Sequence, residues 1–128
     1  MAFGFAGPTV SGHIDTGEEI LFDMVRLLGL DSPLLTYLEK EFYESPRIAR
    51  EKVAELRHEA LQALRAIIEA SRARPNVFER AVAARPPAFR REYATGLRSW
   101  DPERCLASLV AVCDDALEHD AGIDCFSD

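Results

Sequence analysis

The sequence predicts an all-α protein, a compact bundle of about five to six helices formed by residues 1–128 as one domain. Three observations support this prediction. Apolar residues recur at helical spacing through most of the chain, a capping residue precedes proline at three places, and almost no segment alternates strictly enough for a half-buried strand. A chain of 128 residues is also long enough to bury a core without disulfides or metals.

The first predicted helix follows residues 1–14, which we expect to form a short extended N-terminal arm. Thr16 and Glu19 have the spacing of a capping box, and Gly29 stands where a left-handed residue ends a helix. Asp31-Ser32-Pro33 places a capping residue before a proline, which predicts the start of a second, short helix.

Two long helices, over about residues 46–73 and 102–119, are predicted to form the spine of the bundle. Ser45-Pro46 opens the first of them with the same pattern of cap and proline. Short helices are expected between the two, because prolines interrupt the apolar pattern there. Residues 120–128 are predicted to be an acidic tail.

Charge is divided unevenly along the chain, whose net charge is −7. Residues 1–45 hold eight acidic and two basic residues, residues 46–98 hold six and twelve, and residues 99–128 hold eight and one. The acidic ends can fold against the basic middle, in which case each surface pair contributes at most about 1 kcal/mol. Alternatively, one block stays exposed and meets a partner of opposite charge.

The leading functional hypothesis is a non-catalytic acidic module that binds a basic protein. Small acidic bacterial proteins of one domain often act as immunity proteins or antitoxins, which occlude a basic toxin. Electrostatic steering would favour such an encounter. The candidate contact residues are acidic side chains near the C-terminus and a second patch near the predicted second helix: Asp114, Asp115, Glu118 and Asp120, with Glu39, Glu41 and Tyr43.

A basic patch is predicted in the middle of the chain, comprising Arg72, Arg74, Arg80, Arg85, Arg90, Arg91 and Arg98. Aromatic residues lie among these arginines, a combination that can grip phosphates and stack on bases. The isoelectric point near 5.0 argues against nucleic acid as the partner, because most nucleic-acid-binding domains are basic overall.

A row of glutamates, Glu51, Glu55 and Glu59, repeats at every fourth position of the first long helix. Like charges at this spacing repel by a few tenths of a kcal/mol per pair, so something should compensate them. The arginines of residues 72–98 are candidates within the chain, and basic residues of a partner would serve equally.

A metal site is a weak alternative. Glu55-x-x-His58 resembles half of a di-iron carboxylate site, in which a second helix supplies the same motif. That second motif is missing, and His119 is the nearest substitute. A metal- or ligand-binding bundle, or an enzyme built on one, is therefore the second hypothesis, and an oligomeric regulator or scaffold is the third. No cofactor is predicted.

The expected location is the cytoplasm. The three cysteines are odd in number and lack the spacing of a metal site, which suits a reducing compartment. No apolar run approaches the ~20 residues needed to span a bilayer, so we expect no membrane partner. The first basic residue is Arg26, so the N-terminus lacks the positive region of a secretory signal.

Overall fold

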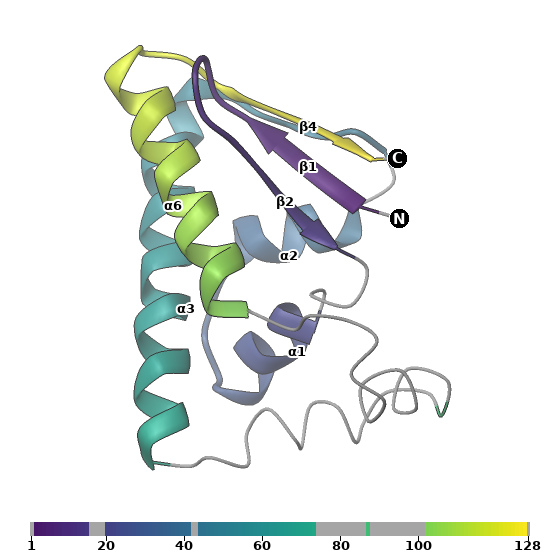
Figure 1. Cartoon of the computed structure of the whole chain (residues 1–128), viewed down its shortest axis with the longest axis vertical. Coiled ribbons are helices and arrows are strands. Elements are labelled where there is room, and N and C mark those ends of the chain that lie inside the picture. Colours follow the sequence, from purple (N-terminus) through teal and green to yellow (C-terminus); the bar gives the residue numbers. More distant parts are fainter. Residues whose placement is uncertain (1, 16–19, 42–43, 74–86, 88–101, 128) are drawn as a thin grey trace.

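A computed structural model of the protein describes residues 2–15, 20–41, 44–73, 87 and 102–127 (Figure 1). These residues form a four-stranded antiparallel sheet together with helices, so the prediction of an all-α bundle is wrong. In chain order, the elements are β1 (Ala2–Ala6), β2 (Ser11–Asp15), α1 (Ile20–Leu27), α2 (Pro33–Lys40), β3 (Arg47–Ile48), the short 3-10 helix η2 (Arg50–Lys52), α3 (Val53–Ala73), α6 (Pro102–Glu118) and β4 (Ile123–Ser127).

The sheet brings together the two ends of the described chain, in the strand order β2-β1-β4-β3. The predicted N-terminal arm, residues 1–14, instead contributes the β1–β2 hairpin, and the predicted acidic tail, residues 120–128, contains β4. Phe5 lies opposite Cys125 in the β1–β4 pair. Neighbouring strands form backbone hydrogen bonds with each other, so segments that are too short to be recognised as strands one at a time are stable together in the sheet.

The core lies between the inner face of the sheet and the helices. Phe3, Phe5, Ile14 and Ile123 project from the strands into this layer and are almost fully buried. Helices α3 and α6 run antiparallel beside each other, and the sheet lies along one side of the pair (Figure 1). Burying one large apolar side chain contributes about 1.5–3 kcal/mol, so this layer is the main source of stability.

The second predicted long helix is confirmed, because α6 spans Pro102–Glu118. The first starts later than predicted, at Val53 instead of residue 46. Ser45 adopts a left-handed backbone (φ 47°), and the amide of Cys125 donates a hydrogen bond of 2.9 Å to the carbonyl of Pro46. Ser45-Pro46 therefore opens a short strand, and a pattern typical of helix starts was misleading here.

Two local predictions are confirmed. Helix α2 begins at Pro33, and Gly29 has a positive φ of 71° just after α1, where the amide of Leu30 donates to the carbonyl of Val25 at 3.3 Å. The predicted capping box at Thr16 and the short helices expected between the long ones lie outside the described residues.

Candidate functional site

Asp115, predicted to contact a partner, is instead used inside the molecule. Its carboxylate accepts hydrogen bonds from the Thr9 amide (2.8 Å), the Thr9 hydroxyl (2.6 Å) and the Val10 amide (2.9 Å). These bonds fasten the β1–β2 turn to α6, and only 5% of Asp115 is exposed. The bond from the Thr9 hydroxyl is the main cause that lowers the pKa of Asp115. This carboxylate is thus charged and already satisfied.

Three further predicted contact residues form ion pairs with arginines of the same chain. The pairs are Asp114 with Arg57, Asp120 with Arg50, and Glu39 with Arg26. Arg57 and Asp114 join α3 to α6, and the Arg50–Asp120 distance is 3.2 Å. These three carboxylates are thus paired within the chain, although the side chains of Asp114 and Asp120 remain 53% and 84% exposed.

The remaining predicted contacts divide into described and undescribed residues. Glu118 is exposed at the end of α6, and its charge is one of the causes that raise the pKa of the neighbouring His119. Glu41 follows α2, and its amide donates 2.9 Å to the carbonyl of Tyr37. Tyr43 lies outside the described residues. The side chains of the predicted basic patch are not described either. Arg72 falls within α3, but only its backbone is described. The other members lie outside the described residues: Arg74, Arg80, Arg85, Arg90, Arg91 and Arg98.

The row of glutamates, with Glu51 in η2 and with Glu55 and Glu59 in α3, is compensated by contacts that the sequence did not reveal. Glu51 pairs with Arg50 at 3.2 Å, and Glu55 pairs with Lys52 at 3.5 Å. Glu59 is 7% exposed and accepts hydrogen bonds from the amides of Leu34 and Leu35. Neither an arginine of residues 72–98 nor a partner is needed to explain the row.

Glu59 acts as the N-terminal cap of α2, although it belongs to α3. The residue before this helix, Ser32, makes no side-chain capping bond. The Leu34 and Leu35 amides are two of the four that an α-helix leaves without internal partners, and Glu59 takes both at 2.9 and 3.0 Å. Burial raises the pKa of Glu59, and the two amide bonds offset part of that rise. In the sequence, the only indication of this contact is that Glu59 is a glutamate on the apolar side of a helix.

The alternative metal site is not assembled. Glu55 is paired with Lys52, and Nδ1 of His119 lies 2.9 Å from the carbonyl oxygen of Asp115, a contact that raises the pKa of His119. His58 is exposed on α3. Among the described residues, no group of three or more metal-ligating side chains could hold an ion.

The cysteines are poorly suited to nucleophilic chemistry. Cys105, Cys113 and Cys125 are free and buried. Burial raises the pKa of the thiols of Cys113 and Cys125 to about 12, so both remain protonated and unreactive at neutral pH.

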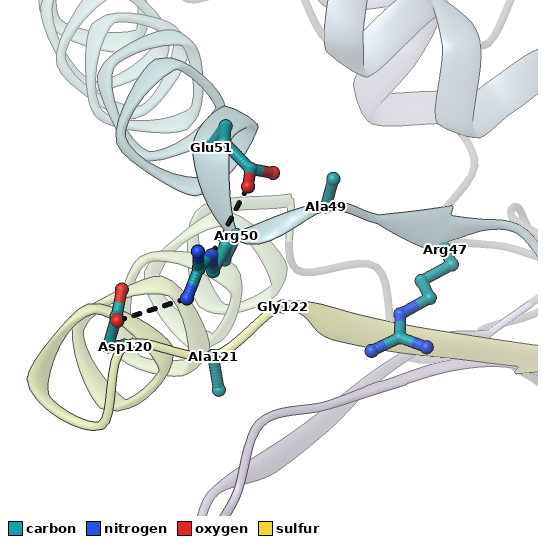
Figure 2. A pocket seen from close by; sticks show the side chains of 7 residues that line it. All are labelled: Arg47, Ala49, Arg50, Glu51, Asp120, Ala121 and Gly122. Carbon is teal, nitrogen blue, oxygen red and sulfur yellow. Dashed lines mark hydrogen bonds and ion pairs between the residues drawn. The ribbon is translucent and has the colours of Figure 1, made fainter.

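A charged cleft lies where the turn between α6 and β4 meets β3 and η2 (Figure 2). Its volume is about 430 Å³, within the range of small-molecule sites. We use the name charged cleft for the space lined by Arg47, Ala49, Arg50, Glu51, Asp120, Ala121 and Gly122.

The backbone geometry explains how this cleft forms. Asp120 has a positive φ of 51°, and the Ala121 amide donates 2.8 Å to the Ala116 carbonyl, which closes α6. At Gly122, a side-chain carbon would lie 2.6 Å from the carbonyl oxygen of Ile48. Glycine therefore allows the α6–β4 turn to rest on the backbone of β3, which brings Asp120 beside Arg50.

No protein-family model matches the chain, and no curated protein or solved structure is significantly similar to it. The class that the geometry defines is a two-layer α/β unit with a charged cleft beside the sheet. Within the described ranges, no helix has both the length and the apolar composition needed to cross a membrane.

Proposed function

We propose that the chain is a non-catalytic protein-binding module that contacts a basic protein through the C-terminal end of α6. One observation carries this proposal. The last turns of α6 hold Asp114, Asp115 and Glu118, and its last turn holds no basic residue. The C-terminus of a helix already carries a partial negative charge, so acidic side chains there destabilise the helix by a few tenths of a kcal/mol each.

Internal contacts relieve only part of this negative charge. Asp114 and Asp120 have arginine partners, and Asp115 is bonded to the hairpin turn. Glu118 keeps an exposed charge, and the side chain of Asp120 is 84% exposed despite its partner. A basic surface placed against Glu118 and Asp120 would be attracted by both carboxylates and by the helix end, which favours rapid association.

In its more specific form, the proposed role is that of a bacterial immunity protein or antitoxin that occludes a basic toxin. The net charge of −7 supports a basic partner, since long-range attraction depends on the summed charge. We propose the cytoplasm as its location, because three free cysteines suit a reducing compartment.

Site-specific crosslinking followed by charge reversal tests this proposal. A photo-reactive amino acid at position 118 should capture a basic protein in cells of the source organism, whereas the same group at position 69, an exposed glutamate near the C-terminal end of α3, should not. With the captured protein purified, Glu118→Lys should slow association about fivefold to tenfold at low salt and flatten its salt dependence.

Glu69→Lys is the matched control, because it makes the same change in net charge away from the end of α6. It should slow association less than twofold. Equal crosslinking at both positions, or equal slowing by both reversals, would mean that the end of α6 is not the contact surface.

A further inference from the structure

We propose that the charged cleft is a binding site for a phosphate group, carried by a small phosphate monoester or supplied as inorganic phosphate. The cleft takes a ligand of opposite charge to the proposed protein partner, and Asp120 borders both sites. This proposal rests on two arginines that line one cavity from neighbouring positions of the chain, Arg47 on β3 and Arg50 at the start of η2 (Figure 2).

The two guanidinium groups retain hydrogen-bonding capacity. Arg50 uses Nε for Glu51 and Nη1 for Asp120, each at 3.2 Å. Arg47 has only a distant contact between Nε and Asp124, at 3.5 Å. In the described part of the chain, the terminal nitrogens of Arg47 and Nη2 of Arg50 therefore make no hydrogen bond. Guanidinium groups with free donors are the side chains best suited to bind phosphate oxygens.

The existing partners of the arginines can be displaced at small cost. The side chains of Arg47 and Arg50 are 73% and 59% exposed, and exposed ion pairs contribute at most about 1 kcal/mol. Asp120 can turn into solvent when a ligand takes its place. The internal carboxylates are thus competitors that weaken binding without blocking it.

The same competition selects phosphate over carboxylate. A ligand carboxylate would replace one singly charged group with another of the same kind, so little would be gained. A phosphate monoester carries nearly two negative charges at pH 7 and three acceptor oxygens, so it offers these arginines more charge and more acceptors than a carboxylate does.

Titration of the whole protein, followed through its backbone amides by NMR at low ionic strength and about pH 7.5, tests the site. Phenyl phosphate is the probe, benzoate is the carboxylate of similar shape, and inorganic phosphate is the third ligand. Phenyl phosphate should saturate with a Kd on the order of 1 mM and shift the amides of residues 49–51 and 120–122. Benzoate should bind at least fivefold more weakly. Tighter binding of phenyl phosphate than of inorganic phosphate identifies an ester as the ligand, and equal binding identifies the bare anion.

Variants make the test specific to the cleft. Arg47→Gln and Arg50→Gln should each weaken phenyl phosphate binding about fivefold to tenfold. Arg65→Gln, an exposed arginine in the middle of α3, should have no effect. Asp120→Asn should tighten binding about threefold, because it removes a competitor while keeping a residue that tolerates a positive φ. Thermal melts would show that each variant is folded.

Three results would overturn the proposal: no saturation up to about 20 mM phenyl phosphate, benzoate binding as tightly as phenyl phosphate, or equal weakening by Arg50→Gln and Arg65→Gln. Failure of Asp120→Asn to tighten binding would contradict the displacement of Asp120.

Discussion

Two buried carboxylates, Asp115 on α6 and Glu59 on α3, hold the molecule together at different places. Each accepts backbone amide hydrogen bonds from a segment distant in sequence: Asp115 from the turn of the β1–β2 hairpin, and Glu59 from the first turn of α2. Both residues are at least nine-tenths buried. They differ in the balance between burial and hydrogen bonding.

That balance gives the two carboxyl groups opposite pKa shifts. At Asp115, the hydroxyl and amide of Thr9 outweigh burial, so the pKa is lowered. At Glu59, burial outweighs the amides of Leu34 and Leu35, and the nearby charges of Glu55 and Asp31 add to the rise. Two differences therefore give the carboxyl groups opposite pKa shifts, although both accept amide hydrogen bonds: Asp115 has a hydroxyl donor and the nearby His119, whereas Glu59 has only like charges nearby in the described part of the chain.

Removing the carboxylate of Glu59 should have the largest effect on stability. Glu59→Ala leaves two helix-terminal amides without an acceptor, and that of Leu35 is buried. We expect a loss of roughly 2–3 kcal/mol in the free energy of unfolding, measured by urea denaturation.

Glu55→Ala is the control for this prediction, because Glu55 lies one turn earlier on α3 and is exposed. Its loss should stay within about 0.5 kcal/mol. Glu59→Gln should fall between the two, since its amide oxygen can accept both bonds that Oε1 accepts, but it lacks the negative charge and the second contact of Oε2 with the Leu34 amide. Equal effects of Glu59→Ala and Glu55→Ala would show that α2 does not depend on this cap.

Asp115→Asn should have a smaller but clear effect. In the wild type, Oδ2 accepts both the Thr9 and Val10 amides, and Oδ1 accepts the Thr9 hydroxyl. The asparagine oxygen can keep the two amide bonds, but the negative charge is lost and the NH₂ group makes the Thr9 hydroxyl an acceptor instead of a donor. We expect the Tm to fall by roughly 5 °C in a calorimetric scan.

Asp114→Asn and Thr9→Val complete this test. Asp114 is the exposed neighbour of Asp115 and should change the Tm by no more than about 2 °C. Thr9→Val removes the hydroxyl donor, so its effect should overlap with that of Asp115→Asn in a double-mutant cycle. Strictly additive effects would mean that the hydroxyl bond contributes nothing to holding the hairpin.

Local signals in the sequence predicted the helices better than the sheet. The start of α2, the end of α1 at Gly29 and the extent of α6 are each encoded within a few neighbouring residues. The strands β1 and β4 are five residues each, and they pair although most of the chain separates them in sequence. The residue pattern of either strand therefore does not indicate which segment it pairs with. The alternation of Phe3 with Phe5 was visible, but it did not say what the segment pairs with.

The candidate site was predictable only in part, for the same reason. Asp120 was identified as a surface carboxylate, and the structure places it at the charged cleft. Arg47 and Arg50 were assigned to the start of a long helix, so their position beside the α6–β4 turn could not be foreseen. Asp115 and Glu59 resemble solvated helix residues in sequence, because only tertiary contacts supply the amides that they accept.

The smallest expected effect is on the pH dependence of stability, in which the two carboxylates should differ. The pKa of Asp115 is lower in the folded protein than its ordinary value of 3.8, so its contribution is present above that pH and is lost as the pH falls through the lowered pKa. The pKa of Glu59 is raised above its ordinary value of 4.5. The folded protein therefore binds the proton more tightly than the unfolded chain, and it loses stability as the pH rises from 4.5 through the raised pKa.

Urea denaturation between about pH 3 and pH 7 should therefore show that the difference in unfolding free energy between the wild type and Asp115→Asn becomes smaller at the acidic end. Relative to Glu59→Gln, the wild type should instead lose stability as the pH rises above 4.5. Parallel pH profiles for the wild type and both variants would contradict the opposite shifts, and with them the distinction between the two junctions.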